Sequence, residues 1–386
     1  MAPLANVPPH WKIVQTRRVA TVRNGADYRP VEVPDGGYPV YGSGGEFRRS
    51  AKYLFDGESV LFGRKGTVDR PLLVSGRFWT VDTMFYTELQ STAEARFFYY
   101  VALTVPFAYY ATNTAVPSMT QNDLSSHPIP LPPLDEQRAI ANYLDRETAQ
   151  IDTLIAEQQR LIELLHERRS AAVATHLAAG GATRRPLKHL AEVQTGVTLG
   201  GEGEPADPEW PYLRVANVQA GRLNLDEIKH VRVPAERASR SMLRRGDILM
   251  TEGGDIDKLG RGALWPGSDS PMLHQNHLFA VRPNDRLDSE FLVYWLTGPE
   301  VRKYFEMTAK QTTNLAATNK WTLSQLPVLC PPLDEQRRIV AELDEVTAKI
   351  DTLIAEAERF IELSKERRSA LITAAVTGQI EIPGVA

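Results

Sequence analysis

The sequence predicts an α+β protein in which two similar mixed α/β domains are separated by two long antiparallel coiled-coil helices, with a pseudo-two-fold axis. Three observations lead to this prediction. One segment occurs twice, at residues 124–171 and 323–370, with 31 of 48 positions identical and no gap. Apolar side chains within it recur every three or four positions, as on one face of a helix. The intervening stretches are short apolar runs bounded by Gly, Asp and Pro, which is typical of strands.

The constant offset of 199 residues between the two copies divides the chain into four parts. We expect a first variable domain at 1–125, a first long helix at 126–180, a second variable domain at 181–322, and a second long helix with a C-terminal tail at 323–386.

The two variable domains contain matching segments in the same order. The matching pairs are residues 57–66 with 246–255, 78–88 with 272–282, and 95–104 with 289–298. The last pair predicts a helix before each repeated segment. Each match is weak alone, but their common order predicts that both domains share one fold and differ in their surface loops.

Each repeated segment predicts one long helix. Pro132 and Pro133 prevent an earlier helical turn, and acidic side chains follow in the first turn, where the helix dipole favours negative charge. No Pro or Gly interrupts the first copy before Gly180, so we expect a helix from Leu134 to His176, about 65 Å long. Apolar residues at seven-residue spacing form a coiled-coil seam in each copy. Two equal seams so far apart in the chain most simply pack against each other, antiparallel.

Composition excludes several classes of protein. With 42% apolar and 24% charged residues, the chain has the composition of a folded globular protein. Its single cysteine, Cys330, excludes an internal disulfide framework and a cysteine-based zinc site, and it fits a cytoplasmic location. We expect no membrane span, because no apolar stretch approaches ~18 uninterrupted residues.

The net charge is −4, whereas nucleic-acid binders usually carry a basic surface. The acidic excess lies in residues 126–180 and 323–386, and the two variable domains together carry a net charge of +3. This distribution allows a nucleic-acid surface on the variable domains without establishing one.

These features together resemble the specificity subunit of type I restriction–modification systems. The resemblance is carried by PPLDEQ at 132–137 and 331–336, by the IDTLIAE and ERRSA stretches of both copies, by the opening VPPHWKIVQTRRVA, and by HQNHLFAV at 274–281. It covers nearly the whole chain, in the order target-recognition domain, helix, second target-recognition domain, helix.

The resemblance implies a non-catalytic DNA-recognition and scaffold subunit. Each variable domain would read one half of a bipartite target in double-stranded DNA. The helices would set the spacer and dock two methyltransferase subunits, which restriction/translocase subunits join. S-adenosylmethionine, Mg and ATP are then expected on partner subunits only, and no cofactor, metal or membrane is expected for this chain. The docking candidates are Glu136, Gln137, Arg138, Glu335, Gln336 and Arg337.

The sequence lacks catalytic motifs. DPEW at 207–210 lacks the second Pro of the tetrapeptide with which adenine methyltransferases grip a flipped base, and no G-x-x-x-x-G-K-[ST] phosphate loop occurs. Asp255, Asp257 and Lys258 have the residue types of a nuclease site, but such clusters arise readily by chance in charged loops.

Side chains that can recognise DNA gather in both variable domains. Arg and Lys suit guanine, Asn and Gln suit adenine, and phosphates accept from any cation or donor. The candidates in the first domain are Ser43, Arg48, Arg49, Lys52, Arg64, Lys65, Ser118, Thr120, Gln121 and Asn122. Those in the second domain are Arg214, Asn217, Lys258, Arg261, Gln275, Asn276, Lys310, Gln311, Thr312, Thr313 and Asn314.

Other interpretations remain open from the sequence. The chain can be a structural coiled-coil adaptor, or a methylase or nuclease with cryptic motifs. Any single DNA candidate can belong to an ordinary solvated loop, and Gln275 and Asn276 can be polar residues of the core. His274 and His277 lack further ligands for a metal, so we interpret them as hydrogen-bonding or packing residues.

Overall fold

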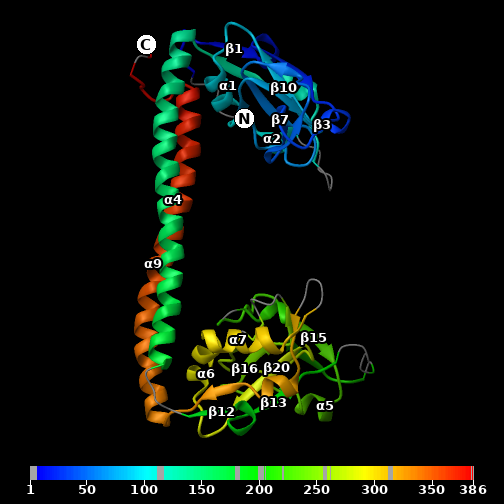
Figure 1. Ribbon diagram of the computed structural model, residues 1–386, viewed down its shortest axis with the longest axis vertical. Helices are drawn as coiled ribbons and strands as arrows, with labels where there is room; N and C mark the ends of the chain where they lie inside the picture. The colour runs from blue at the N-terminus through cyan, green and yellow to red at the C-terminus, as the bar shows by residue number, and fades with distance from the viewer. Residues whose placement is uncertain are drawn as a thin grey trace. The chain divides into compact units, whose positions relative to one another are not determined.

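The computed structural model describes residues 7–110, 117–178, 183–198, 204, 206–219, 221–254, 259–260, 262–311, 316–383 and 385. The chain divides into two compact units, Met1–Arg160 with Ala357–Ala386, and Leu161–Glu356. Each unit contains one mixed α/β domain and one end of each long helix (Figure 1).

The main sheet of the first unit is antiparallel, with the strand order β2–β10–β7–β8. Its strands are β2 (Ala20–Asn24), β7 (Ser59–Gly63), β8 (Leu72–Val74) and β10 (Met84–Leu89). The helix α1 (Ala95–Ala102) lies between this sheet and α4 (Figure 1), and Phe97 is buried in one core with Phe62 of the sheet and Leu144 of α4. The apolar residues of α1 therefore join the domain to the long helix.

A second sheet completes the first domain, with the order β3–β5–β4–β9–β6. Its strands are β3 (Glu32–Val33), β4 (Tyr38–Gly42), β5 (Gly45–Ser50), β6 (Phe55–Asp56) and β9 (Arg77–Thr80). The pair β4–β9 is parallel and the others are antiparallel. A separate apolar core that includes Val40 and Phe78 packs this sheet against Leu61 of β7.

The second unit repeats the strand order of the main sheet and the parallel pair of the second sheet, which here has three strands instead of five. Its main sheet has the order β13–β20–β16–β18, with β13 (Ala191–Thr195), β16 (Ile248–Thr251), β18 (Gly262–Leu264) and β20 (Leu278–Pro283). Its second sheet contains β14 (Glu209–Leu213), β15 (Lys229–Arg232) and β19 (Leu273–His274), and the pair β14–β19 is parallel, as β4–β9 is. The prediction that both variable domains share one fold is confirmed.

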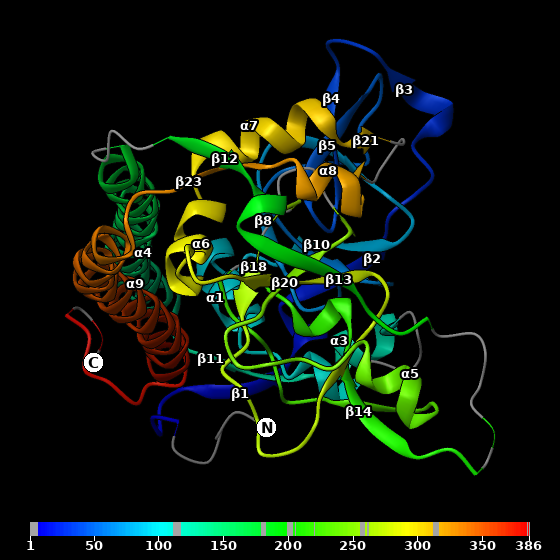
Figure 2. The ribbon, with the colours of Figure 1, turned by 90° about the horizontal axis from the view of Figure 1, so that it is seen from below.

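Short elements connect these sheets to the long helices. β1 (Lys12–Gln15) pairs with β11 (Pro128–Leu131), and β12 (Arg184–Pro186) pairs with β23 (Pro327–Leu329). The other short helices are α2 (Phe107–Tyr110), α3 (Gln121–Ser126), α5 (Ala235–Ser239), α6 (Ser289–Leu296), α7 (Pro299–Thr308) and α8 (Lys320–Ser324). The 3-10 turns are η2 (Thr16–Arg18), η3 (Arg29–Val31), η4 (Leu187–His189) and η5 (Val215–Asn217). In Figure 2, α6 lies between the main sheet of the second unit and the long helices.

The long helices α4 (Leu134–Ala178) and α9 (Leu333–Val376) contain 45 and 44 residues, as the repeat predicts. In the first unit, Leu144 of α4 shares a core with Ile372 of α9. In the second unit, Leu165 packs with Ile350 and Ile354. The early part of each helix thus meets the late part of the other, so the helices run antiparallel. No described helix is apolar enough over a sufficient length to cross a membrane.

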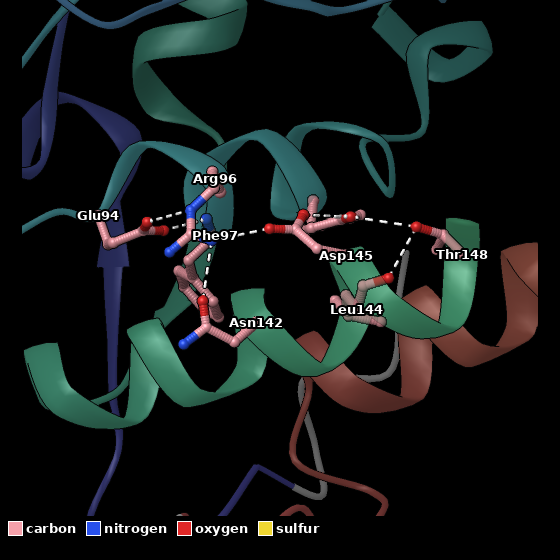
Figure 3. A network of polar contacts seen from close by, with 8 residues as sticks. Glu94, Arg96, Phe97, Asn142, Leu144, Asp145 and Thr148 are labelled. Carbon is pink, nitrogen blue, oxygen red and sulfur yellow. Dashed lines mark hydrogen bonds and ion pairs between the residues drawn. The ribbon is translucent and has the colours of Figure 1, made fainter. Parts of the chain in front are cut away.

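Each domain is fixed to its own helix by a tyrosine hydroxyl. Tyr100 of α1 donates to Asp145 at 2.8 Å, and Tyr294 of α6 donates to Asp344 at 2.6 Å. Burial, followed by the hydrogen bond to Asp344, raises the pKa of Tyr294 to about 12, so the hydroxyl keeps its proton at neutral pH. In the first unit Arg96 adds an ion pair to Asp145 at 2.7 Å (Figure 3).

Candidate nucleic-acid interface

In the first domain, the structure brings together two groups of DNA candidates that are distant in sequence. The loop after β7 carries Arg64 and Lys65, and Lys65 pairs with Ser118 in an isolated antiparallel bridge. The Arg64 N–H donates to the carbonyl of Thr83 at 2.8 Å, and the Met119 N–H donates to the carbonyl of Arg64 at 3.0 Å. A basic loop and a polar segment therefore form one surface.

The two basic side chains of this loop, Arg64 and Lys65, differ in how far their surroundings restrict their conformation. The Arg64 guanidinium lies 5.9 Å from the centre of the Phe85 ring and donates to the carbonyl of Asp82 at 3.4 Å. The side chain of Lys65 is exposed. Stacking on an aromatic ring limits the conformations of Arg64, which suits it to a contact of fixed geometry.

The segment that follows Ser118 begins α3, and its polar side chains have structural partners. Thr120 caps the helix by accepting from the Asp123 N–H at 3.2 Å. Gln121 donates from Nε2 to the carbonyl of Val22 at 2.7 Å, and Asn122 accepts from Ser126 at 3.4 Å. These contacts shape the segment beside Lys65.

The remaining first-domain candidates lie on or beside β5 of the second sheet. Arg48 forms an ion pair with Glu32 at 3.3 Å, and Arg49 forms one with Glu46 at 3.1 Å. Lys52 is exposed, and Ser43 is half-buried in the turn between β4 and β5. The structure does not join this group to the loop of Arg64.

The corresponding loop of the second domain follows β16 and has the same backbone contacts. The Glu252 N–H donates to the carbonyl of His277 at 3.0 Å, and the Thr318 N–H donates to the carbonyl of Glu252 at 2.9 Å. Then β17 (Gly253–Gly254) pairs with β22 (Ala316–Ala317), which pairs with β21 (Lys310–Gln311). Lys310 therefore lies on a strand that neighbours this loop through β22.

These contacts define which residues of the two loops are equivalent. Glu252 takes the place of Arg64, and His277 takes the place of Thr83. The sequence comparison missed Glu252, because aligning the segments at Gly57 and Gly246 sets Glu252 against Gly63. The Glu252 carboxylate accepts from His277 Nδ1 at 2.8 Å, and their side chains are 34% and 59% exposed.

Three second-domain candidates have their backbone or side chain engaged by the core. Asn217 is 3% exposed, accepts from the Arg214 N–H at 2.8 Å, and donates to the carbonyls of Asn224 and Glu227, both at 2.9 Å. Its prediction as a DNA contact is wrong, because the amide is buried and its hydrogen-bonding groups are used. Gln275 and Asn276 are half-buried, and their N–H groups donate to backbone carbonyls.

Arg214 is the remaining candidate near η5, and its guanidinium pairs with Glu227 at 3.4 Å. Several candidates lie outside the described residues: Lys258, Arg261, Thr312, Thr313, Asn314 and the side chain of Gln311, together with Asp255 and Asp257. Among the residues that the structure describes, no group of three or more His, Cys, Asp or Glu side chains could hold a metal ion.

Three of the docking candidates have buried side chains. Gln137 is 1% exposed, accepts from the Glu94 N–H and donates to the carbonyls of Thr92 and Pro132. Gln336 is fully buried and makes the equivalent contacts in the second unit, accepting from the Asp288 N–H and donating to two carbonyls.

The third, Glu136, is buried and accepts from the indole N–H of Trp11 at 2.9 Å. The docking prediction is therefore corrected for Gln137, Gln336 and Glu136. Gln137 and Glu136 tie the start of α4 to the first domain, and Gln336 ties the start of α9 to the second. Arg138 and Arg337 are exposed, and Glu335 is half-buried beside Arg338.

Exposed apolar side chains near the loops are a feature that sequence patterns did not indicate. Trp321 is 72% exposed near the start of α8, three residues after Thr318. Met307 is 76% exposed on α7, shortly before Lys310. Their exposure depends on tertiary packing, so no local pattern could have distinguished them from core residues.

Comparison with known proteins finds one family model twice in the chain, once for each domain and the long helix that follows it. A family model for the type I restriction modification DNA specificity domain matches residues 8–164 and again residues 182–362. The EcoKI specificity subunit of Escherichia coli strain K12, a type I restriction enzyme subunit, is 23% identical over 274 residues, covering 65% of this chain and 57% of that protein. The chain thus spans little more than half the length of this curated relative.

Solved structures share the fold. A chain from a structure of a type I R-M system superposes with a TM-score of 0.67 at 18% identity, covering 97% of this chain and 99% of the other. The HsdS subunit from Thermoanaerobacter tengcongensis superposes with a TM-score of 0.52 at 19% identity, covering 97% and 98%. With the family model matched once in each unit, the chain belongs to the family of type I restriction modification DNA specificity proteins.

Proposed function

We propose that the chain is a non-catalytic subunit of a type I restriction/methyltransferase complex that recognises DNA and serves as its scaffold. Each domain reads one half of a bipartite target in duplex DNA, and the helices set the spacer. S-adenosylmethionine, Mg and ATP belong to partner subunits in this proposal.

One observation carries the proposal: the two domains have the same framework but different chemistry at the same loop. The strand order of the main sheet, the parallel strand pair and the backbone contacts of the loop agree in both domains. At the equivalent position one domain has Arg64 and the other has Glu252. A shared framework with different polar side chains is suited to reading two different base sequences, because direct readout depends on matching donors and acceptors to base edges.

Methyltransferase subunits require a surface that occurs twice. The repeat provides two equivalent sets of apolar side chains on the long helices, each 41–48% exposed. The sets are Leu161, Leu164 and Leu353 in the second unit, and Phe360, Leu363 and Leu154 in the first. Within each set the first two residues are three positions apart and share a helix face. Two equal patches fit two copies of one partner subunit.

The docking surface is tested by stoichiometry. Leu164→Glu should remove one methyltransferase subunit from the assembled complex, and Leu363→Glu should remove one as well, measured by light scattering after size exclusion. Glu167→Ala, an exposed change on the same helix, serves as the control. Retention of two subunits by both leucine variants would reject these patches as the docking site.

The central experiment maps methylated bases in host DNA with and without this chain. We expect a split target with two short half-sites only when the chain is present. The pure chain is also incubated with duplex DNA and a labelled methyl donor. Methylation by the chain alone would show that it is an enzyme, whereas an assembled complex without sequence preference would favour a structural adaptor.

A further inference from the structure

We propose that His277, held by Glu252, determines base specificity in the second domain by accepting a hydrogen bond from an amino-bearing base, adenine or cytosine. The inference rests on the proposed function and names the residues that carry it out in one half-site. The sequence alone suggested only hydrogen bonding or packing for His277, and it did not indicate Glu252.

The first step is the position of the pair. The Glu252 backbone makes the contacts that Arg64 makes in the first domain, to His277 in place of Thr83 and to Thr318 in place of Met119. Both loops follow an inner strand of their main sheet, β7 or β16, whose residues are mostly buried. If the first loop faces DNA, the shared framework places the second loop at the same point of its own half-site.

The second step is the state of the imidazole. The Glu252 carboxylate has no proton to donate, so His277 Nδ1 carries the hydrogen that bridges the 2.8 Å separation. In the neutral ring Nε2 is then an acceptor. In the major groove, exocyclic amino groups are presented by adenine N6 and cytosine N4, whereas guanine presents O6 and N7 acceptors. An Nε2 acceptor therefore selects adenine or cytosine, and the donors of Arg64 suit guanine.

The third step is charge. Arg64 and Lys65 put two positive charges on the first loop, whereas residues 252–254 of the second loop carry only the Glu252 carboxylate. A carboxylate near phosphates weakens binding to all sequences. The first loop should therefore add to the salt dependence of DNA binding, and the second loop should reduce it.

These steps give specific expectations for substitutions in the assembled complex, measured by selection from randomised duplex DNA. His277→Ala should lower the preference at one position of the second half-site by about 5- to 150-fold and leave the first half-site unchanged. Glu252→Ala should lower the same preference, because nothing then orients the ring.

Glu252→Gln separates positioning from charge. Its carbonyl oxygen can still accept from Nδ1, so the base preference should remain, while affinity for non-target DNA rises because a negative charge is removed. His166→Ala, which removes an exposed histidine on α4, should change neither quantity.

An unchanged second half-site in His277→Ala overturns the inference. So does an equal loss of affinity for all sequences, which would indicate a phosphate contact. Either outcome is compatible with a split target in the wild-type complex, so the proposed function would still stand. If the wild-type complex recognised no split target, the proposed function would fail together with the inference.

Discussion

Arg169 on α4 donates from Nε to the carboxylate of Asp351 on α9 at 3.0 Å. The repeat produces the same contact in the first unit, where Arg368 donates to Asp152 at 2.9 Å. Each helix thus supplies the acid of one pair and the base of the other. Two parallel helices in register would bring acid beside acid and base beside base, so this charge pattern favours the antiparallel arrangement.

The ion pairs select the orientation but contribute little stability. Both partners of the Arg169–Asp351 pair are more than one-third exposed, so Arg169→Ala should lower the free energy of unfolding by less than about 1 kcal/mol. Leu165→Ala in the buried seam should lower it by about 2–5 kcal/mol. Urea unfolding of the two variants measures the difference. A larger loss for Arg169→Ala would mean that charge, rather than burial, holds the second-unit seam together.

Gln336 should be more important for stability than its exposed neighbour. Gln336→Ala leaves the Asp288 N–H and the Pro331 carbonyl without their side-chain partner, which costs about 1–3 kcal/mol for each buried group left unsatisfied. The Arg286 carbonyl loses the amide donor but still accepts from the Cys330 thiol at 3.8 Å. Thermal unfolding should show a clear decrease in Tm. Arg337→Ala is the matched control, and equal behaviour of the two variants would contradict the anchoring role.

His274 should make the second domain sensitive to acid. Burial lowers its pKa to about 4, whereas the unfolded chain has the ordinary value of 6.5. Because the unfolded state binds the proton more readily, stability is complete above pH 6.5 and falls by on the order of 3 kcal/mol as the pH decreases to 4. Acid titration followed by circular dichroism measures this decrease.

A substitution within the same motif provides the comparison. His274→Gln should flatten the pH dependence between 6.5 and 4, because the substitution removes the buried imidazole. Identical acid curves for the wild type and His274→Gln would show that another group governs the transition.

Lys65 should contribute to DNA affinity without contributing to specificity if it contacts a phosphate. Lys65→Ala would then weaken binding to all sequences and reduce the slope of log K against log salt by about 1. If Arg64 reads a base, Arg64→Ala should reduce discrimination at one position by about 1–3 kcal/mol. Lys349→Ala, which removes a lysine paired with Glu345 on α9, should change neither. Unchanged DNA binding in both loop variants would mean that neither Arg64 nor Lys65 contacts DNA.

The domains should be exchangeable as modules. Replacing residues 1–123 by the first domain of another family member should change one half-site and keep the other. Gln137 and Asp145, which accept hydrogen bonds from the first domain, lie on α4 and remain in the hybrid. Methylation mapping of the hybrid complex gives the result. A change in both half-sites would contradict independent readout.

The sequence by itself determined the helices and the kinship of the two domains. Periodicity and Pro–Pro starts are local properties, so the expected helix from Leu134 to His176 agrees closely with α4. The order of the matching segments predicted one fold for both domains, and the strand orders confirm it.

Only the tertiary structure decided how individual polar residues are used. Gln137 and Gln336 had the residue type and place of docking residues, yet the N–H groups from which they accept, those of Glu94 and Asp288, lie more than forty residues away in sequence. Asn217 has the residue type of a base reader, but its amide N–H groups donate to the carbonyls of Asn224 and Glu227. Glu252 became equivalent to Arg64 only through hydrogen bonds to segments distant in the chain. The burial of a side chain and its hydrogen-bond partners are decided when such segments pack together, and local sequence patterns do not indicate that packing.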